Sequence, residues 1–145
     1  MLREDGGRVL LLGRGHGLEP GGYGLAMDKV NLAEKFARIE EVYKPKLVAE
    51  YNHNKLILTR ARGEFVWHKH DDTDDLFFVV SGRLVIQLRD RDVELGPGEL
   101  FVVPRGVEHC PRADPEAEIL VIEPIGTTNT GDAAPGEMTA EPERI

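Results

Sequence analysis

From residue 47 onward, short apolar segments alternate with residues that favour turns. The segments are rich in β-branched and aromatic residues, and the breaks between them contain Gly, Pro, Asn, Asp or Ser. No helical pattern alternates with these segments, which argues against a parallel βαβ sheet. The pattern therefore predicts an antiparallel all-β domain. The predicted strands span 47–51, 56–60, 65–70, 76–80, 84–88, 93–95, 100–103, 109–112 and 119–123.

Three histidines and one carboxylate have a spacing that suits a single metal ion. His68 and His70 are two residues apart on a predicted strand, so their side chains point to the same face. Asp75 begins the next strand and can face this pair, and His109 comes from a third strand that follows a Pro-Arg-Gly turn. Imidazole nitrogens with a carboxylate oxygen suit a divalent transition metal such as Zn, Fe, Mn, Co, Ni or Cu.

These residues lie in two blocks that resemble the paired motifs of the cupin superfamily, G-x5-H-x-H-x3,4-E-x6-G and G-x5-P-x-G-x2-H-x3-N. The matching positions are His68, His70 and Gly82 in the first block, and Gly98, Pro104, Gly106 and His109 in the second. The resemblance implies a double-stranded β-helix, the cupin jelly-roll barrel, with His68, His70, Asp75 and His109 as the metal ligands.

Three positions depart from the family pattern. Gly63 lies one residue too close to His68, which a β-bulge could absorb. Asp75 replaces the family's Glu, so its side chain is one methylene shorter, and direct, water-mediated or no coordination all stay open. Ala113 replaces an Asn that is not a ligand. The looser spacing also allows Asp74, but the six-residue gap before Gly82 selects Asp75.

The barrel is expected to span residues 47–124, with shorter segments on either side. Residues 1–26 are glycine-rich and are predicted to form a flexible arm, and Met27 is an alternative start. Residues 27–46 should hold a lead-in and a short helix over 31–42, with a buried stripe of Leu32, Phe36, Ile39 and Tyr43. The polar tail, residues 125–145, has the composition of a loop or disordered segment.

Composition restricts the partners and the compartment. The 145 residues fit one domain, and a formal net charge of −8 at pH 7 argues against nucleic acid or an anionic membrane as a partner. No apolar run is long enough to span a bilayer. Cys110 is the only cysteine, so an internal disulfide is impossible, and we expect a cytoplasmic protein.

Several predicted strands are apolar on both faces. If Asp75 and Phe77 face the barrel interior, Leu76 and Phe78 face outward. An exposed apolar face of this kind favours a homodimer that buries it. The alternative is that the helix and the chain ends cover it within one protomer.

The ligand set is compatible with several functions. A metal-dependent enzyme acting on a small molecule is expected, either a Lewis-acid isomerase or epimerase or a dioxygenase. The alternative is a non-catalytic cupin that binds a sugar or an effector. No acid or base for proton transfer can be identified from the sequence, and the catalytic residues are unknown at this stage.

Overall fold

The computed structural model describes residues 4–5, 8–9 and 28–145, which fall into two units, Met1–Asn31 and Leu32–Ile145. In the first unit, β1 (Glu4–Asp5) pairs antiparallel with β2 (Arg8–Val9). The rest of the predicted flexible arm lies outside the described residues. No helix among the described residues is long and apolar enough to cross a membrane.

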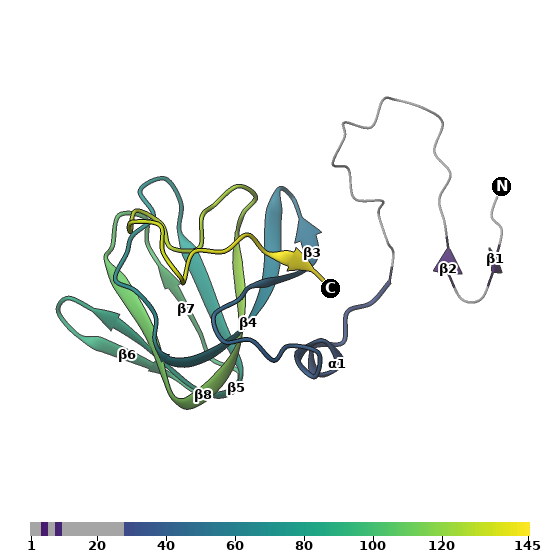
Figure 1. Cartoon of the computed structure of the whole chain (residues 1–145), viewed down its shortest axis with the longest axis horizontal. Helices are drawn as coiled ribbons and strands as arrows, with labels where there is room; N and C mark the ends of the chain where they lie inside the picture. Colours follow the sequence, from purple (N-terminus) through teal and green to yellow (C-terminus); the bar gives the residue numbers. More distant parts are fainter. Residues whose placement is uncertain (1–3, 6–7, 10–27) are drawn as a thin grey trace. The chain divides into compact units, whose positions relative to one another are not determined.

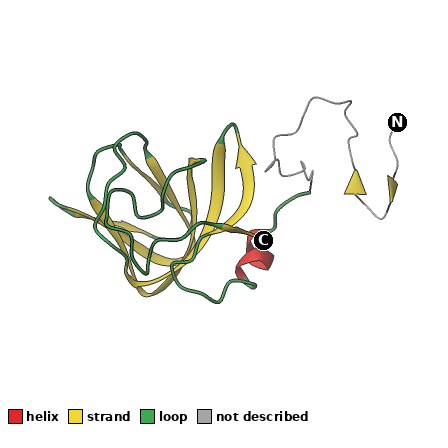
Figure 2. Ribbon diagram, turned by 45° about the horizontal axis from the view of Figure 1, so that its top comes forward, coloured by secondary structure: helices red, strands yellow, loops and turns green. Residues whose placement is uncertain are grey.

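The second unit is a curled sheet with one short helix, α1 (Leu32–Phe36) (Figures 1 and 2). Its strands follow the order β6-β5-β8-β4-β3-β9, and β7 pairs with β5. All pairings are antiparallel except that of β9 with β3, so the predicted all-β fold is confirmed. The strands are β3 (Lys46–Tyr51), β4 (Asn54–Glu64), β5 (Asp75–Leu88), β6 (Asp92–Leu95), β7 (Leu100–Val103), β8 (His109–Pro124) and β9 (Glu143–Arg144).

The two long strands at the centre were each predicted as two shorter ones. β5 runs through the expected break at Ser81 and Gly82, with register shifts against β8 on both sides of Gly82. Gly82 has a φ of 78°, and a side-chain carbon there would collide with the Glu116 carbonyl oxygen. The glycine therefore bends a continuous strand and does not end it. Segments 109–112 and 119–123 are likewise joined in β8.

Residues 65–70 do not form the predicted strand. The chain follows β8 from the Glu64–Arg112 pair to an isolated bridge between His68 and His109. From Glu64 to His68 the chain advances four residues, whereas β8 advances only three between their partners, Arg112 and His109. The two segments therefore cannot form a regular ladder. The bulge proposed for Gly63 is present as a register shift between Ala61 and Gly63.

The predicted helix over 31–42 is too long, because α1 ends at Phe36. At the end of α1, Arg38 N and Ile39 N donate to carbonyls only three residues back, and Arg60 of β4 donates to carbonyls of the same segment. Its Nη2 donates to Phe36 O and its Nε to Ile39 O, both at 2.9 Å. The predicted burial nevertheless holds for most of the stripe, since Phe36, Ile39 and Tyr43 are all buried while Leu32 is partly exposed.

Two apolar clusters lie on opposite faces of the sheet. The inner cluster fills the barrel and includes Phe77, Val79, Ile119 and Val121. The outer cluster joins Phe36 and Ile39 to sheet residues, chiefly Val48 and Leu58, and Ile145 packs against it. The helix and the C-terminal end of the chain therefore cover part of the outer face within one protomer. Coverage of this kind was the alternative to a homodimer.

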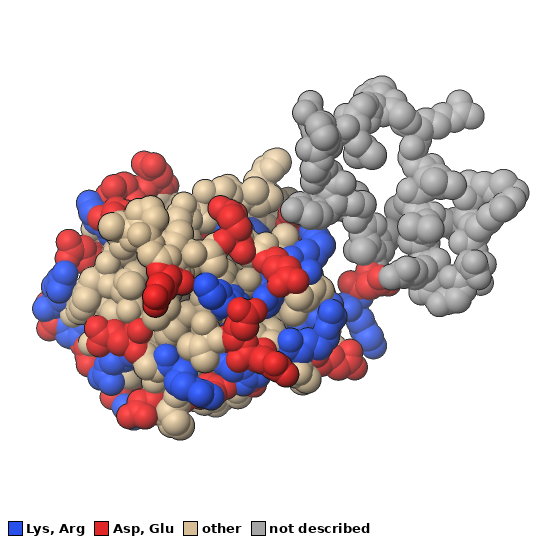
Figure 3. Space-filling model, in the orientation of Figure 1, with Lys and Arg blue, Asp and Glu red and all other residues tan. Residues whose placement is uncertain are grey.

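The outer face is not covered everywhere. Leu100 and Val102 of β7 are 58% and 40% exposed. Phe78 pairs with both Leu100 and Leu120, and Leu76 pairs with both Val102 and Ile122. These residues form two apolar rows across β7, β5 and β8. Elsewhere, acidic and basic side chains are interspersed over the face shown in Figure 3.

Candidate metal centre

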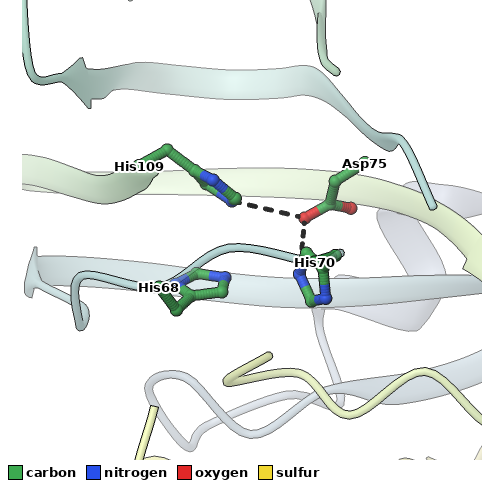
Figure 4. Close-up of side chains that lie close together, drawn as sticks. All are labelled: His68, His70, Asp75 and His109. Atoms are coloured by element: carbon green, nitrogen blue, oxygen red, sulfur yellow. Dashed lines mark ion pairs between the residues drawn. The ribbon is translucent and has the colours of Figure 1, made fainter. Parts of the chain in front are cut away.

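The structure brings the four candidate ligands together from three segments of the chain. His68 and His70 follow β4, Asp75 begins β5, and His109 begins β8. All four are buried, and one possible ligand atom from each lies within 4.8 Å of the others. Figure 4 shows the three rings and the carboxylate converging on one space. That they coordinate an ion stays a prediction.

Buried polar atoms of the cluster lack hydrogen-bond partners among the described residues. Asp75 Oδ2 lies 3.4 Å from His70 Nε2 and 3.7 Å from His109 Nε2. These contacts do not satisfy the two imidazole nitrogens, and Asp75 Oδ1 is also unpaired. Buried nitrogen and oxygen atoms that face one another without partners are what a cation site presents.

Backbone carbonyls orient two of the rings. His68 Nδ1 lies 2.8 Å from Val66 O, and His109 Nδ1 lies 2.9 Å from Val107 O. An Nδ1–H that donates to a carbonyl leaves Nε2 with a free lone pair, which is the tautomer a metal ligand needs. The residues present therefore fit a transition-metal ion.

In the metal-free protein, electrostatics favour the ligating forms of His68 and Asp75 but not of His70. Burial, together with neighbouring His109, lowers the pKa of His68 to about 4, so this ring is neutral at pH 7. Burial also lowers the pKa of His70, but its contact with Asp75 outweighs this and the net shift is upward. Burial would raise the pKa of Asp75, yet its contacts with His109 and His70 hold it below the ordinary value. The carboxylate thus keeps its negative charge.

The alternative carboxylate does not reach the cluster. Asp74 is exposed, and its Oδ1 accepts from Arg105 N at 2.9 Å. Strand alternation sends the two neighbouring aspartates to opposite sides, and Asp75 is the one that faces inward.

Two buried charged residues beside the cluster were missed by the sequence analysis. Glu123 of β8 and Lys55 of β4 are 3% and 6% exposed and lie opposite each other in the sheet. Leu76 lies opposite Ile122, so Asp75 and Glu123 are neighbours on adjacent strands. Glu123 Oε1 is 3.4 Å from Lys55 Nζ and forms no hydrogen bond among the described residues.

A cavity of about 50 Å³ connects these groups. Its polar lining includes His68, Asp75, Glu123 and Asn129, and apolar side chains such as Phe65 and Phe77 complete it. This volume admits a few water-sized groups beside the cluster. Burial, with a smaller effect from Asp75, raises the pKa of Glu123 to about 7.

The fold and the site together define a small antiparallel β-barrel with a buried three-histidine, one-aspartate cluster at one end. The family model described as a Cupin domain (Cupin_2) matches residues 57–123. The chain belongs to the cupin superfamily, as the motif resemblance predicted.

Relatives support this assignment without naming an activity. An uncharacterized Bacillus subtilis protein, YdbB, is 30% identical over 84 residues, which cover 57% of this chain and 74% of YdbB. The crystal structure of a cupin-2 domain containing protein from Shewanella frigidimarina is 43% identical and has a TM-score of 0.65. That match covers 66% of this chain and 93% of the other.

A more distant structure belongs to an enzyme. Hydroquinone 1,2-dioxygenase from Sphingomonas sp. TTNP3 is 18% identical with a TM-score of 0.60, over 74% of this chain and 35% of that one. At this identity the similarity shows a shared fold and does not carry the activity over.

Proposed function

We propose that His68, His70, Asp75 and His109 hold one divalent transition-metal ion, and that the protein is an enzyme that moves a proton on a small molecule. A bound ion would supply Lewis-acid chemistry, polarising an oxygen of the substrate and acidifying an adjacent C–H bond. The substrate class is a small molecule whose oxygens can bind a metal, in keeping with the size of the cavity. The reaction class is isomerisation or epimerisation.

Glu123 is the observation that carries this proposal. Proton transfer needs an acid or base that reaches the substrate and titrates near neutral pH. Glu123 lines the same cavity as His68 and Asp75, and in the metal-free protein its pKa is raised to about 7, so a bound cation would favour the role of a base. Its Oε1 has no hydrogen-bond partner among the described residues, so it can accept a proton from a molecule in the cavity.

Lys55 would keep Glu123 in place. Its Nζ donates to Thr127 O at 2.7 Å and lies 3.4 Å from Glu123 Oε1. The lysine charge favours the carboxylate form and partly opposes the effect of burial. In the metal-free protein Glu123 is thereby held near the midpoint of its titration, and the charge of a bound cation would lower its pKa and favour the base form.

The test is solvent-proton exchange on a panel of small hydroxy acids and hydroxy ketones in D2O, followed by NMR. Metal-loaded wild type should place deuterium on carbon in at least one compound. The Glu123→Gln variant should lose about a hundredfold or more of this rate while keeping its metal. Glu40→Gln removes the same charge at an exposed position outside the site and serves as the control.

Other outcomes of this experiment favour other functions. Oxygen consumption without proton exchange would favour a dioxygenase, for which the same ligand set is suitable. Tight binding of a sugar or acid without either reaction would favour a non-catalytic binding protein. Exchange that proceeds equally in Glu123→Gln would overturn the role of Glu123.

We also propose that the protein is a homodimer. The two apolar rows across β7, β5 and β8 end at Leu100 and Val102, which are the most exposed side chains in the rows. A second copy presenting the same rows would bury them symmetrically. We propose separately that the protein is cytoplasmic. Cys110 is a free, buried thiol, which suits a reducing compartment.

A further inference from the structure

The C-terminal strap, residues 126–140, is the part of the chain whose composition indicated a loop or disorder. It leaves the end of β8 and crosses the barrel to reach β9, beside β3 (Figure 1). Met138 packs against the inner core, and Thr130 is 2% exposed. Polar composition hid this packing, because most of the strap's contacts are hydrogen bonds.

The strap binds the peptide between two candidate metal ligands. Lys69 N donates to Asp132 Oδ1 at 2.8 Å, and Asp132 N donates to Lys69 O at 3.1 Å. Both backbone groups of Lys69 therefore pair with a single residue of the strap. The backbones of the two flanking ligands bond to other segments. His68 and His109 exchange two backbone hydrogen bonds, and His70 O accepts from Gly106 N at 2.8 Å.

Gly131 brings the strap backbone against one of these ligands. Its φ is 52°, and a side-chain carbon there would collide with Lys69 O and lie 3.0 Å from His68 Cδ2. A glycine is needed both for this conformation and for the close approach. The strap thus contacts the ring of a candidate ligand as well as the peptide that follows it.

Hydrogen bonds within the strap hold it in this position. Asn129 Nδ2 donates to Met138 O at 2.8 Å, and Asn129 Oδ1 accepts from Ala140 N at 3.0 Å. The hydroxyl oxygens of Thr130 and Thr139 lie 3.0 Å apart. Asn129 also lines the cavity beside the cluster, so the strap forms one wall of the site.

We infer that the C-terminal strap is a working part of the metal centre: Asp132 is a positioning residue that fixes the Lys69 peptide and so holds His68 and His70 in their ligating positions. This inference rests on the proposed metal site. Loosening the strap would let both ligands move, and groups that orient metal ligands typically change metal affinity by about ten- to a hundredfold. The strap should therefore slow the release of the ion.

Co²⁺ is a suitable probe, because its visible spectrum reports the geometry of its ligands. The full-length protein is loaded with Co²⁺ and mixed with excess EDTA, and the release rate is recorded. Asp132→Ala should release the ion about tenfold faster or more, with a changed spectrum. Asp132→Asn keeps an acceptor for Lys69 N and should restore near wild-type release.

Asp71→Ala is the matched control. Asp71 Oδ1 accepts from Lys69 Nζ at 2.7 Å, so this variant removes an equal charge and a contact to the same residue while leaving the backbone contact in place. Its release rate should equal that of wild type. Gly131→Ala is a second disruption of the strap, and in the metal-free protein the Lys69 amide should exchange its hydrogen faster in both strap variants.

The outcomes separate this inference from the proposal on which it rests. A wild type that binds no Co²⁺ overturns the metal site itself. If wild type binds Co²⁺ but Asp132→Ala and Gly131→Ala release it at the wild-type rate, the metal site stands and the strap has no role in it. Equal loss in Asp132→Ala and Asp132→Asn would also overturn the role of Asp132 as a hydrogen-bond acceptor.

Discussion

Asp75 and Glu123 are neighbouring buried carboxyls whose pKa values shift in opposite directions, although burial favours the neutral form of both. Contacts with His109 and His70 keep the pKa of Asp75 below its ordinary value. Glu123 has Lys55 as its one nearby cation among the described ion pairs, and burial raises its pKa to about 7. Two carboxyls with separated pKa values can take different roles, one as a ligand and the other in proton transfer.

Glu123 should make the stability of the metal-free protein depend on pH. The pKa of this carboxyl rises from 4.5 to about 7 on folding, so the folded state binds the proton more tightly than the unfolded chain. Its contribution to stability is present in full below pH 4.5 and is lost as pH rises toward 7. The full effect is up to about 3 kcal/mol, since a tenfold change in proton binding corresponds to about 1.4 kcal/mol.

The measurement is chemical denaturation of wild type and Glu123→Gln between pH 4.5 and 8 in the presence of a chelator. The free energy of unfolding of the variant should increase relative to that of wild type as pH rises through this window. Parallel curves for the two proteins would contradict the raised pKa.

At the residue scale, sequence could place the ligand candidates but not their neighbours. His68, His70 and His109 stand out through residue type and spacing, and alternation separates Asp75 from Asp74 once the strand is known. Glu123 carries only a weak signal, as the last member of an alternating row with Ile119 and Val121. Its proximity to Asp75 depends on the register between strands distant in the chain, which no local pattern encodes.

At the element scale, α1 depends on one arginine of the sheet. Arg60 donates to carbonyls of Phe36 and Ile39 and pairs with Glu116 and Glu118 of β8. Arg60→Ala should lower the free energy of unfolding by about 2 kcal/mol, because the Ile39 carbonyl loses the Arg60 donor, the Phe36 carbonyl keeps only its bond from Ile39 N, and two carboxylates lose their partner. It should leave metal affinity unchanged, since α1 packs on the outer face and the cluster lies inside.

Arg62→Ala is the control for this prediction. Arg62 shares Glu116 with Arg60 but is 64% exposed, so its loss should cost about 0.5 kcal/mol or less. Thermal and chemical denaturation would measure both variants. Equal destabilisation by the two substitutions would show that Arg60 acts only as a surface charge.

Alternation predicted most strands well, because apolar segments and turn residues act locally. The errors share one physical cause. Arg60 bonds to carbonyls at and beyond the end of α1, and the extra residue against β8 prevents a strand over 65–70. Both contacts join segments far apart in the sequence. Composition predicted a loop or a disordered segment for the tail, and residues 126–140 do form a loop. Its packing could not be predicted, since its partners are backbone groups of a distant segment.

At the scale of the whole molecule, we expect the uncovered part of the outer face to determine the oligomeric state. Leu100→Asp would place a charge within the proposed interface, where desolvation is costly. Wild type should elute as a dimer in size-exclusion chromatography with light scattering, and the variant as a monomer. Tyr51→Asp changes another exposed side chain and should leave the dimer intact. A monomeric wild type at every concentration would contradict the dimer.

The central claim is that one barrel end holds a metal ion. The most direct measurement is elemental analysis of protein expressed without added metal and purified without a chelating resin, in wild type and a His68→Ala, His70→Ala double variant. We predict about one transition-metal ion per wild-type chain, as expected for a site with four protein ligands. The double variant should contain none while keeping its β-sheet circular dichroism. Metal-free wild type, or a folded double variant that retains the ion, would contradict the account.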